Sequence, residues 1–204
     1  MSDSDELEFE LPNRGDDRPG LDELDDDVEV VVEDDEEEDD DDYPEDATED
    51  DIDLVIAMYR EDGQPVALAL DLDLANDLDA MITQLRRVPG DAGAVGMVSI
   101  AEEVFVLVRV RGKRVQVFCS DAAAAEDWPI ARDAVDFLDA ELPDDTEDGY
   151  PVGDADILAD VGLPDFELEA MAEDYDEDTS TLLERIATKM SFGSEFTKAM
   201  ASFG

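Results

Sequence analysis

The sequence predicts an α+β domain in which helices lie on one antiparallel sheet of five strands. Three observations support this fold class. Short apolar runs bounded by turn residues fill residues 52–120, two amphipathic helical patterns interrupt and follow these runs, and glycine-containing turns join two pairs of them. Apolar runs joined by tight turns are typical of antiparallel hairpins. The predicted element order is ββαβββα, preceded by an acidic arm and followed by a small helical segment.

Residues 1–51 are predicted to form a disordered acidic arm. They hold 28 acidic residues against two arginines, in a chain whose formal net charge is −49. A run such as residues 34–46 buries too little apolar surface to offset an ordering cost of about 1–2 kcal/mol per residue. Such a charge repels nucleic acid, because phosphates are bound where Lys and Arg replace their counterions. We therefore expect a basic protein as partner, and no direct binding of nucleic acid.

The sheet domain is predicted over residues 52–142. Residues 52–60 and 65–71 are expected to form a hairpin around Asp62-Gly63, and their continuous apolar content places both strands near the centre of a sheet that is buried on both faces. Residues 74–88 carry apolar side chains at helical spacing and end at Pro89-Gly90, which predicts an amphipathic helix.

Three more strands and a helix complete the predicted domain. The strands are expected at 94–100, 104–110 and 114–120, and Gly112-Lys113 joins the last two with the glycine-first order of a type II′ turn. The helix at 128–141 should bury one face, formed by Ile130, Ala134, Phe137 and Leu138. By analogy of fold alone, this order is similar to longin, roadblock and profilin-like modules, which are mostly binding scaffolds.

The C-terminal part is predicted to be a polar linker at 143–153 and short helices over 154–204. Near the end, four apolar side chains follow a helical spacing and form a stripe, which consists of Phe192, Phe196, Met200 and Phe203. A stripe of this kind packs on its own domain or binds a partner, and we favour its own domain because an uncovered stripe would promote association.

The stretch SDAAAAEDWPIARDAVDFL, residues 120–138, is the part of the chain that looks most like an active site. A nucleophilic serine needs a base, and the chain has no histidine and only three lysines, none in a recognisable motif. The same letters predict local structure instead: Asp121 and Asp127 as helix caps, Pro129 in a first helical turn, and Trp128 as an anchor between helix and sheet.

Cofactor and metal chemistry are not expected. Cys119 has neither a second cysteine nor a histidine beside it, so we predict a structural thiol, no disulfide and no zinc site. Residues 144–149 imitate the start of a calcium loop, but Ala155 stands where the bidentate glutamate belongs. No apolar run approaches the roughly 18 residues of a membrane span, and the N-terminus lacks signal-peptide features, so a cytoplasmic location is expected.

The basic residues of the sheet domain are concentrated in one place. Arg109, Arg111, Lys113 and Arg114 surround the predicted hairpin at Gly112, and Arg86 and Arg87 end the first predicted helix. We predict a local positive patch that serves solubility or docks the acidic arm, with a phosphate site as the alternative.

Several segments of the chain resemble the family of tRNA adenosine deaminase-associated proteins, small bacterial proteins whose genes neighbour that of the tRNA adenosine deaminase. The resemblance covers about residues 52–200, leaves the acidic arm outside, and is most specific between Ser120 and Pro129. The residues that carry it are AMYREDG (57–63), LANDLDAMITQLRRVPGDAGAVGMVSI (74–100), VFVLVRVRGKRV (104–115), CSDAAAAEDWPIARDAVDFL (119–138) and PVGDADILADVGLP (151–164).

This resemblance implies a non-enzymatic interaction or regulatory protein in a tRNA modification setting, with no catalytic residues to carry over. The zinc deaminase signature, H-x-E with P-C-x-x-C, is absent, so the chain does not itself deaminate a base by that chemistry. We expect the acidic arm to compete for a basic RNA-binding surface of the deaminase. Two alternatives remain open: an enzyme that uses only carboxylates, and a scaffold unrelated to tRNA.

Overall fold

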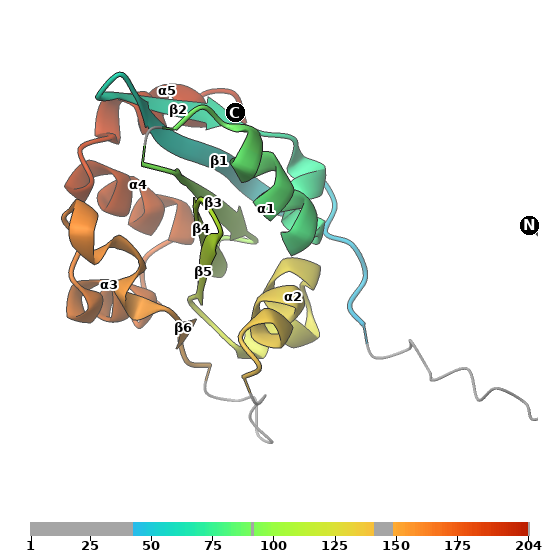
Figure 1. Cartoon of the computed structure of the whole chain (residues 1–204). Coiled ribbons are helices and arrows are strands. Elements are labelled where there is room, and N and C mark those ends of the chain that lie inside the picture. The colour runs from blue at the N-terminus through green and yellow to red at the C-terminus, as the bar shows by residue number, and fades with distance from the viewer. Residues whose placement is uncertain (1–42, 91, 141–148, 204) are drawn as a thin grey trace, which may run out of the picture. The chain divides into compact units, whose positions relative to one another are not determined.

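The computed structural model describes residues 43–90, 92–140 and 149–203. Their centre is an antiparallel sheet of six strands in the order β2-β1-β3-β4-β5-β6 (Figure 1). The α+β class is confirmed, but the prediction of five strands is wrong, because Val152 and Gly153 pair with Cys119 and Phe118 inside the predicted linker. The strands are β1 Ile52–Glu61, β2 Gln64–Ala69, β3 Ala94–Ile100, β4 Val104–Arg111, β5 Arg114–Cys119 and β6 Val152–Gly153.

Helices cover both faces of the sheet. Figure 1 shows α1 and α2 on one side and α3, α4 and α5 on the other. The α-helices are α1 Leu78–Arg87, α2 Pro129–Phe137, α3 Asp165–Ala172, α4 Thr179–Lys189 and α5 Gly193–Met200. Three 3-10 helices join them to the sheet: η2 Leu72–Asn76, η3 Ala123–Glu126 and η4 Ala155–Val161.

The two tight hairpins form through backbone conformations that their residues favour. Between β1 and β2, Asp62 and Gly63 both have positive φ, 51° and 77°, as a type I′ turn requires. Between β4 and β5, Gly112 alone has positive φ, 59°, which agrees with the predicted glycine-first turn. The prediction that both strands of the first hairpin lie near the centre of the sheet is correct for β1, which is buried. It is wrong for β2, which is the partly exposed edge strand.

Two separate apolar cores explain why the strand sequences are apolar without alternation. On β1, Val55 and Ala57 face the core beneath α1 and α2, whereas Leu54, Ile56 and Met58 face the core beneath α3–α5. Neighbouring side chains of a strand point to opposite faces, so a sheet covered on both sides needs apolar residues at both.

The first long helix begins later than its apolar spacing predicts. Asp77 has an extended backbone and its side chain accepts a hydrogen bond from the N–H of Ala80 at 2.7 Å, so Asp77 caps α1 and separates it from η2. Leu78, Met81, Ile82 and Leu85 are buried against the sheet, in agreement with the predicted face.

The buried face of α2 is rotated from the predicted one. Ile130, Ala131, Ala134 and Val135 are buried, whereas Phe137 keeps 47% of its surface exposed, so the prediction that Phe137 is buried is wrong. Apolar spacing alone does not show which of two adjacent apolar stripes a short helix turns toward the sheet.

The described end of the predicted arm, residues 43–51, contacts the sheet domain. The hydroxyl of Tyr43 donates to Asp133 Oδ1 at 2.8 Å. Ala47 is buried and exchanges two hydrogen bonds with the side chain of Asn76, at 2.8 and 3.0 Å. Residues 1–42, which make up most of the predicted arm, and residues 143–148 of the predicted linker lie outside the described residues.

Candidate functional site

In the segment from Ser120 to Trp128, the side chains of Ser120 and Asp121 form hydrogen bonds with backbone N–H groups of the fold. The hydroxyl oxygen of the buried Ser120 accepts from the N–H of Phe105 at 2.9 Å, and its own N–H donates to Phe105 O at 3.0 Å. Asp121 Oδ1 accepts from the N–H of Ala123 at 2.8 Å and opens η3. Pro129 starts α2, but no side chain caps this helix, and Asp127 is exposed. The half-buried Trp128 packs on the core beneath α2.

Cys119 is a structural thiol in this fold. It is buried, and its Sγ donates to the carbonyl oxygen of Asp121 at 3.1 Å. Burial raises the pKa of the Cys119 thiol to about 12, because a thiolate would lose its hydration there. The thiol therefore stays protonated near neutral pH and is a poor nucleophile.

Two of the predicted basic residues are tied to the C-terminal layer. Arg109 lies on β4 with its side chain only 5% exposed, and its Nη1 donates to Ile157 O at 2.6 Å. Arg109 also donates to both carboxylate oxygens of Asp160, and its Nη2 lies 3.0 Å from Oδ2. Arg111 Nη1 donates to the same Oδ2 at 3.0 Å. The hydrogen bond from Arg109 holds the pKa of Asp160 below its ordinary value, although partial burial opposes this. This pairing fastens η4 to the sheet.

The remaining four basic residues that the sequence analysis singled out form no ion pair within the described residues. Arg86 and Arg87 end α1, and Lys113 and Arg114 follow Gly112 in the β4–β5 turn; all four are exposed. They are the free positive charges of the described part of the chain.

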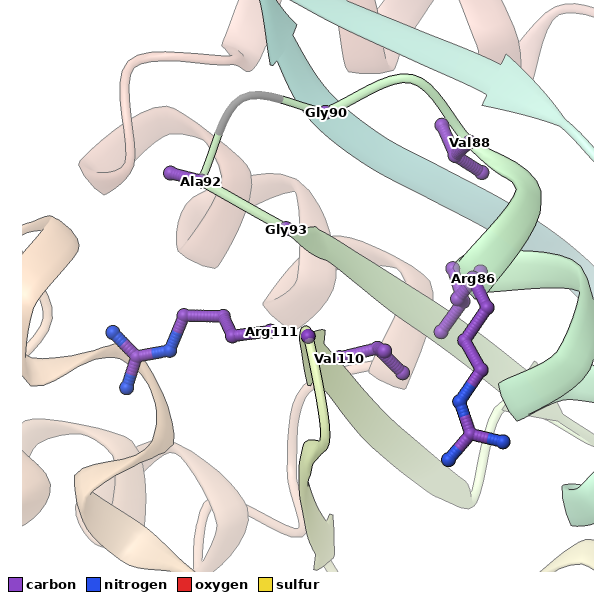
Figure 2. A pocket seen from close by; sticks show the side chains of 9 residues that line it. Arg86, Val88, Gly90, Ala92, Gly93, Val110 and Arg111 are labelled. Carbon is purple, nitrogen blue, oxygen red and sulfur yellow. The ribbon is translucent and has the colours of Figure 1, made fainter.

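A pocket of about 440 Å³ lies between the end of α1 and the β4–β5 turn (Figure 2). Its wall is largely apolar or glycine, and Figure 2 shows the side chains of Arg86 and Arg111 pointing away from one another. Arg111 is already paired with Asp160. The pocket therefore lacks the converging donors that a phosphate clamp needs.

A second pocket, of about 270 Å³, has an acidic lining. It lies between the β3–β4 turn and the segment that joins α3 to α4, and its carboxylates come from Glu102, Glu103, Asp121, Asp174 and Glu177. Arg185 pairs with Glu177 and approaches Asp174. No group of three or more potential ligands in the described ranges is placed to hold a metal ion. An enzyme that used only carboxylates would have its best-placed acids here.

The C-terminal stripe packs on the protein itself. Phe192 and Phe196 are buried in the core beneath α3–α5, and Met200 and Phe203 pack at its edge. The guanidinium of Arg60 lies 4.9 Å from the centre of the Phe192 ring and donates to Met190 O at 3.1 Å. Of the two predicted alternatives, burial on the domain is the one that the structure shows.

Sequence reasoning missed the acidic and aromatic partners that long-range folding brings together. Asp160 is one of many acids in the C-terminal part, and nothing in its neighbourhood marks it as the partner of Arg109. Tyr43 and Asp133 are ninety positions apart, so no local pattern connects them.

Among the described residues, no helix is long and apolar enough to cross a membrane.

The folded part of the chain matches a known family. The model of the Rv3753c-like tRNA adenosine deaminase-associated protein family matches residues 53–193. Protein Rv3753c of Mycobacterium tuberculosis is 32% identical over 152 residues, which cover 73% of this chain and 88% of that protein. No solved structure is significantly similar, so the analogy to longin, roadblock and profilin-like modules stays a prediction.

Proposed function

The chain belongs to the Rv3753c-like tRNA adenosine deaminase-associated protein family, and we propose that it is a non-enzymatic protein that binds the tRNA adenosine deaminase. The observation that carries this proposal is charge: 62 acidic residues stand against 13 basic ones. An enzyme that binds tRNA must present a basic surface, and an acidic protein is complementary to such a surface. This function belongs in the cytoplasm, the location that the sequence predicts.

The arrangement of the reactive side chains supports a role without catalysis. The chain has no histidine, its one cysteine is buried and protonated, and the Ser120 hydroxyl is held in a strand-to-strand hydrogen bond. The basic residues Arg109 and Arg111 are paired with Asp160 of the same chain. The outer surface is thus left mainly to carboxylates, which favour a basic partner over nucleic acid.

We propose further that the acidic arm competes with tRNA for the basic surface of the deaminase. An extended chain rises about 3.3–3.6 Å per residue, and one strand of DNA carries a charge about every 3.4 Å. With 28 acids in 51 residues, a fully extended arm carries an acid about every 6 Å, roughly half the charge density of a nucleic acid strand. The resemblance is one of charge and not of base sequence, so the effect should weaken steeply with salt.

Co-purification from native cells tests the proposal. The tagged full-length protein should recover the tRNA adenosine deaminase at low ionic strength, and the yield should fall as salt is raised. Recovery of no RNA-modifying enzyme and no RNA-binding protein at low salt would refute the proposed function. Recovery of proteins unrelated to tRNA would favour the alternative of an unrelated scaffold.

Deleting residues 1–42 tests the role of the arm separately. This deletion spares residues 43–51, which contact the sheet domain through Tyr43 and Ala47. The shortened protein should fold, bind the deaminase more weakly at low salt and show a flatter salt dependence. Equal affinity of the shortened and full-length proteins at every salt concentration would contradict the competition.

A further inference from the structure

Two exposed aromatic side chains are associated with α2, where residues 43–51 contact the sheet domain. Phe137, the last residue of α2, is 47% exposed and Tyr43 is 45% exposed. The hydroxyl of Tyr43 bonds Asp133, which lies one helical turn before Phe137 on α2. An exposed aromatic side chain is ordinary by itself, and it points to a binding site only where it lines a pocket together with groups that can recognise a ligand.

Carboxylates surround this aromatic surface. A pocket of about 220 Å³ is lined by Phe137, by the buried Leu78 and by four aspartates; we call it the Phe137 pocket, and its aspartates are Asp77, Asp79, Asp133 and Asp136. Within the described residues, Asp136 pairs with Arg132 at 3.3 Å, and the other three aspartates form no ion pair. The pocket therefore keeps a clear excess of negative charge.

The backbone and hydroxyl partners hold two of these acids in fixed positions. Asp133 accepts from Tyr43 through one oxygen and from the N–H of Leu78, at 3.0 Å, through the other. Asp77 accepts from the N–H of Ala80 as the cap of α1. Burial, and then the hydrogen bond and charge of Asp133, raise the pKa of Tyr43 well above its ordinary value, so its hydroxyl stays protonated and keeps donating to Asp133. The acids are thus placed before any partner arrives.

We propose that the Phe137 pocket is the docking site for an arginine or lysine side chain of the deaminase, an inference that rests on the proposed function. A cation over the face of Phe137 gains a cation–π contact and lies beside the aspartates. Arginine suits this arrangement best, because its flat guanidinium stacks on a ring while its edge pairs with carboxylates. An uncharged apolar partner would have to bury these carboxylates without compensation, which is costly.

The position of the pocket in the chain supports the same occupant. In the sequence, Asp39 to Asp42 directly precede Tyr43, whose hydroxyl donates to Asp133 of the Phe137 pocket. A partner surface that is basic enough to attract these acids is also complementary in charge to the aspartates of the pocket. A second copy of this chain, contributing its free cations Arg86, Arg87, Lys113 and Arg114, is the competing occupant.

The affinity of full-length variants for the deaminase tests the assignment. F137A and F137L should each weaken binding about fivefold, because leucine keeps the apolar surface but loses the cation–π contact. F137W should bind at least as tightly as the natural protein. F166A is the matched control, since Phe166 on α3 is 65% exposed and does not line the pocket, and it should bind within about twofold. Wild-type affinity of F137A, or of F137L alone, would overturn the proposal.

A probe that does not depend on the deaminase separates this inference from the proposed function. A tri-arginine amide peptide, titrated into the full-length protein, should shift the ring resonances of Phe137 in NMR spectra and leave those of Phe166 unchanged. D79N should reduce the shift, because Asp79 lines the pocket. If the peptide binds there but the deaminase does not bind the protein, the proposed function fails and the cation site stands. No shift at Phe137, or a dimer in solution that F137A abolishes, would overturn the inference.

Discussion

Replacing Asp160 with alanine is expected to loosen the C-terminal layer, because this residue joins η4 to the centre of the sheet. Asp160 is bonded by Arg109 through both oxygens and by Arg111 through one. Arg109 is 5% exposed and keeps a second partner, the carbonyl oxygen of Ile157, at 2.6 Å. D160A therefore leaves a buried guanidinium with one of its two partners.

The expected loss of unfolding free energy lies between two limits. Removing one partner of a fully buried ion pair costs about 3–5 kcal/mol, whereas exposed pairs contribute about 0–1 kcal/mol. Asp160 is 52% exposed, so water can replace part of what its carboxylate supplies to Arg109. We expect a loss of about 2 kcal/mol, which for a domain of this size lowers Tm by about 4–8 °C.

Urea denaturation and thermal melting of the full-length protein measure this loss. D156A is the matched control, because it removes the same charge from η4 but only one hydrogen bond, to Gln116 at 3.2 Å. The pKa of Asp160 is lowered in the folded protein, so its stabilisation is present above the ordinary Asp value of about 3.9 and is lost as pH falls through the lowered pKa. The difference in unfolding free energy between the wild type and D160A should therefore be constant from pH 7 to about 5, and it should shrink in stronger acid. A loss within about 0.5 kcal/mol of that of D156A at pH 7 would refute the reasoning.

Two further predictions concern the core beneath α1 and α2. G96A should destabilise the protein by about 1–3 kcal/mol, because a Cβ at Gly96 would lie 2.3 Å from Met81 Cε and 3.0 Å from Leu85 Cδ1; an unchanged melting curve would show that Met81 repacks freely. Cys119 should not react with a thiol-specific dye at pH 8 until urea unfolds the protein, because the thiol is buried and its pKa is raised to about 12; rapid labelling of the native protein would contradict its burial.

The sequence predicts those parts of the fold that depend on local pattern and composition. The strand at 94–100 is found with the predicted bounds, because it is a short apolar run between a glycine turn and an acidic turn. The glycine of the β4–β5 turn and the end of α1 before Pro89-Gly90 are confirmed for the same reason. These features are set by neighbours along the chain.

The missed features depend on contacts between distant residues. β6 has two residues, too few for any strand pattern, and forms because the chain returns to the free edge of β5. The rotation of α2 that exposes Phe137 is decided by packing against the sheet, and the pairing of Asp160 with Arg109 requires η4 to pack on the sheet beside β5. Acidic residues are so common here that composition does not single out the ones with partners.

The use of the few basic residues explains how a chain of net charge −49 both folds and keeps an acidic exterior. Apolar burial on both faces of the sheet supplies most of the stabilisation, and Arg109 is the one buried charged side chain among the described residues. Several cations stabilise the C-terminal layer. Arg109 and Arg111 pair with Asp160, and Lys189 pairs with Glu167. Arg60 donates to Met190 O and lies over the ring of Phe192. These positive charges form contacts within the protein. Most of the surface carboxylates in the described residues therefore form no ion pair with the chain itself. This exterior supports the proposal that the partner presents a basic surface, because complementary charges favour association.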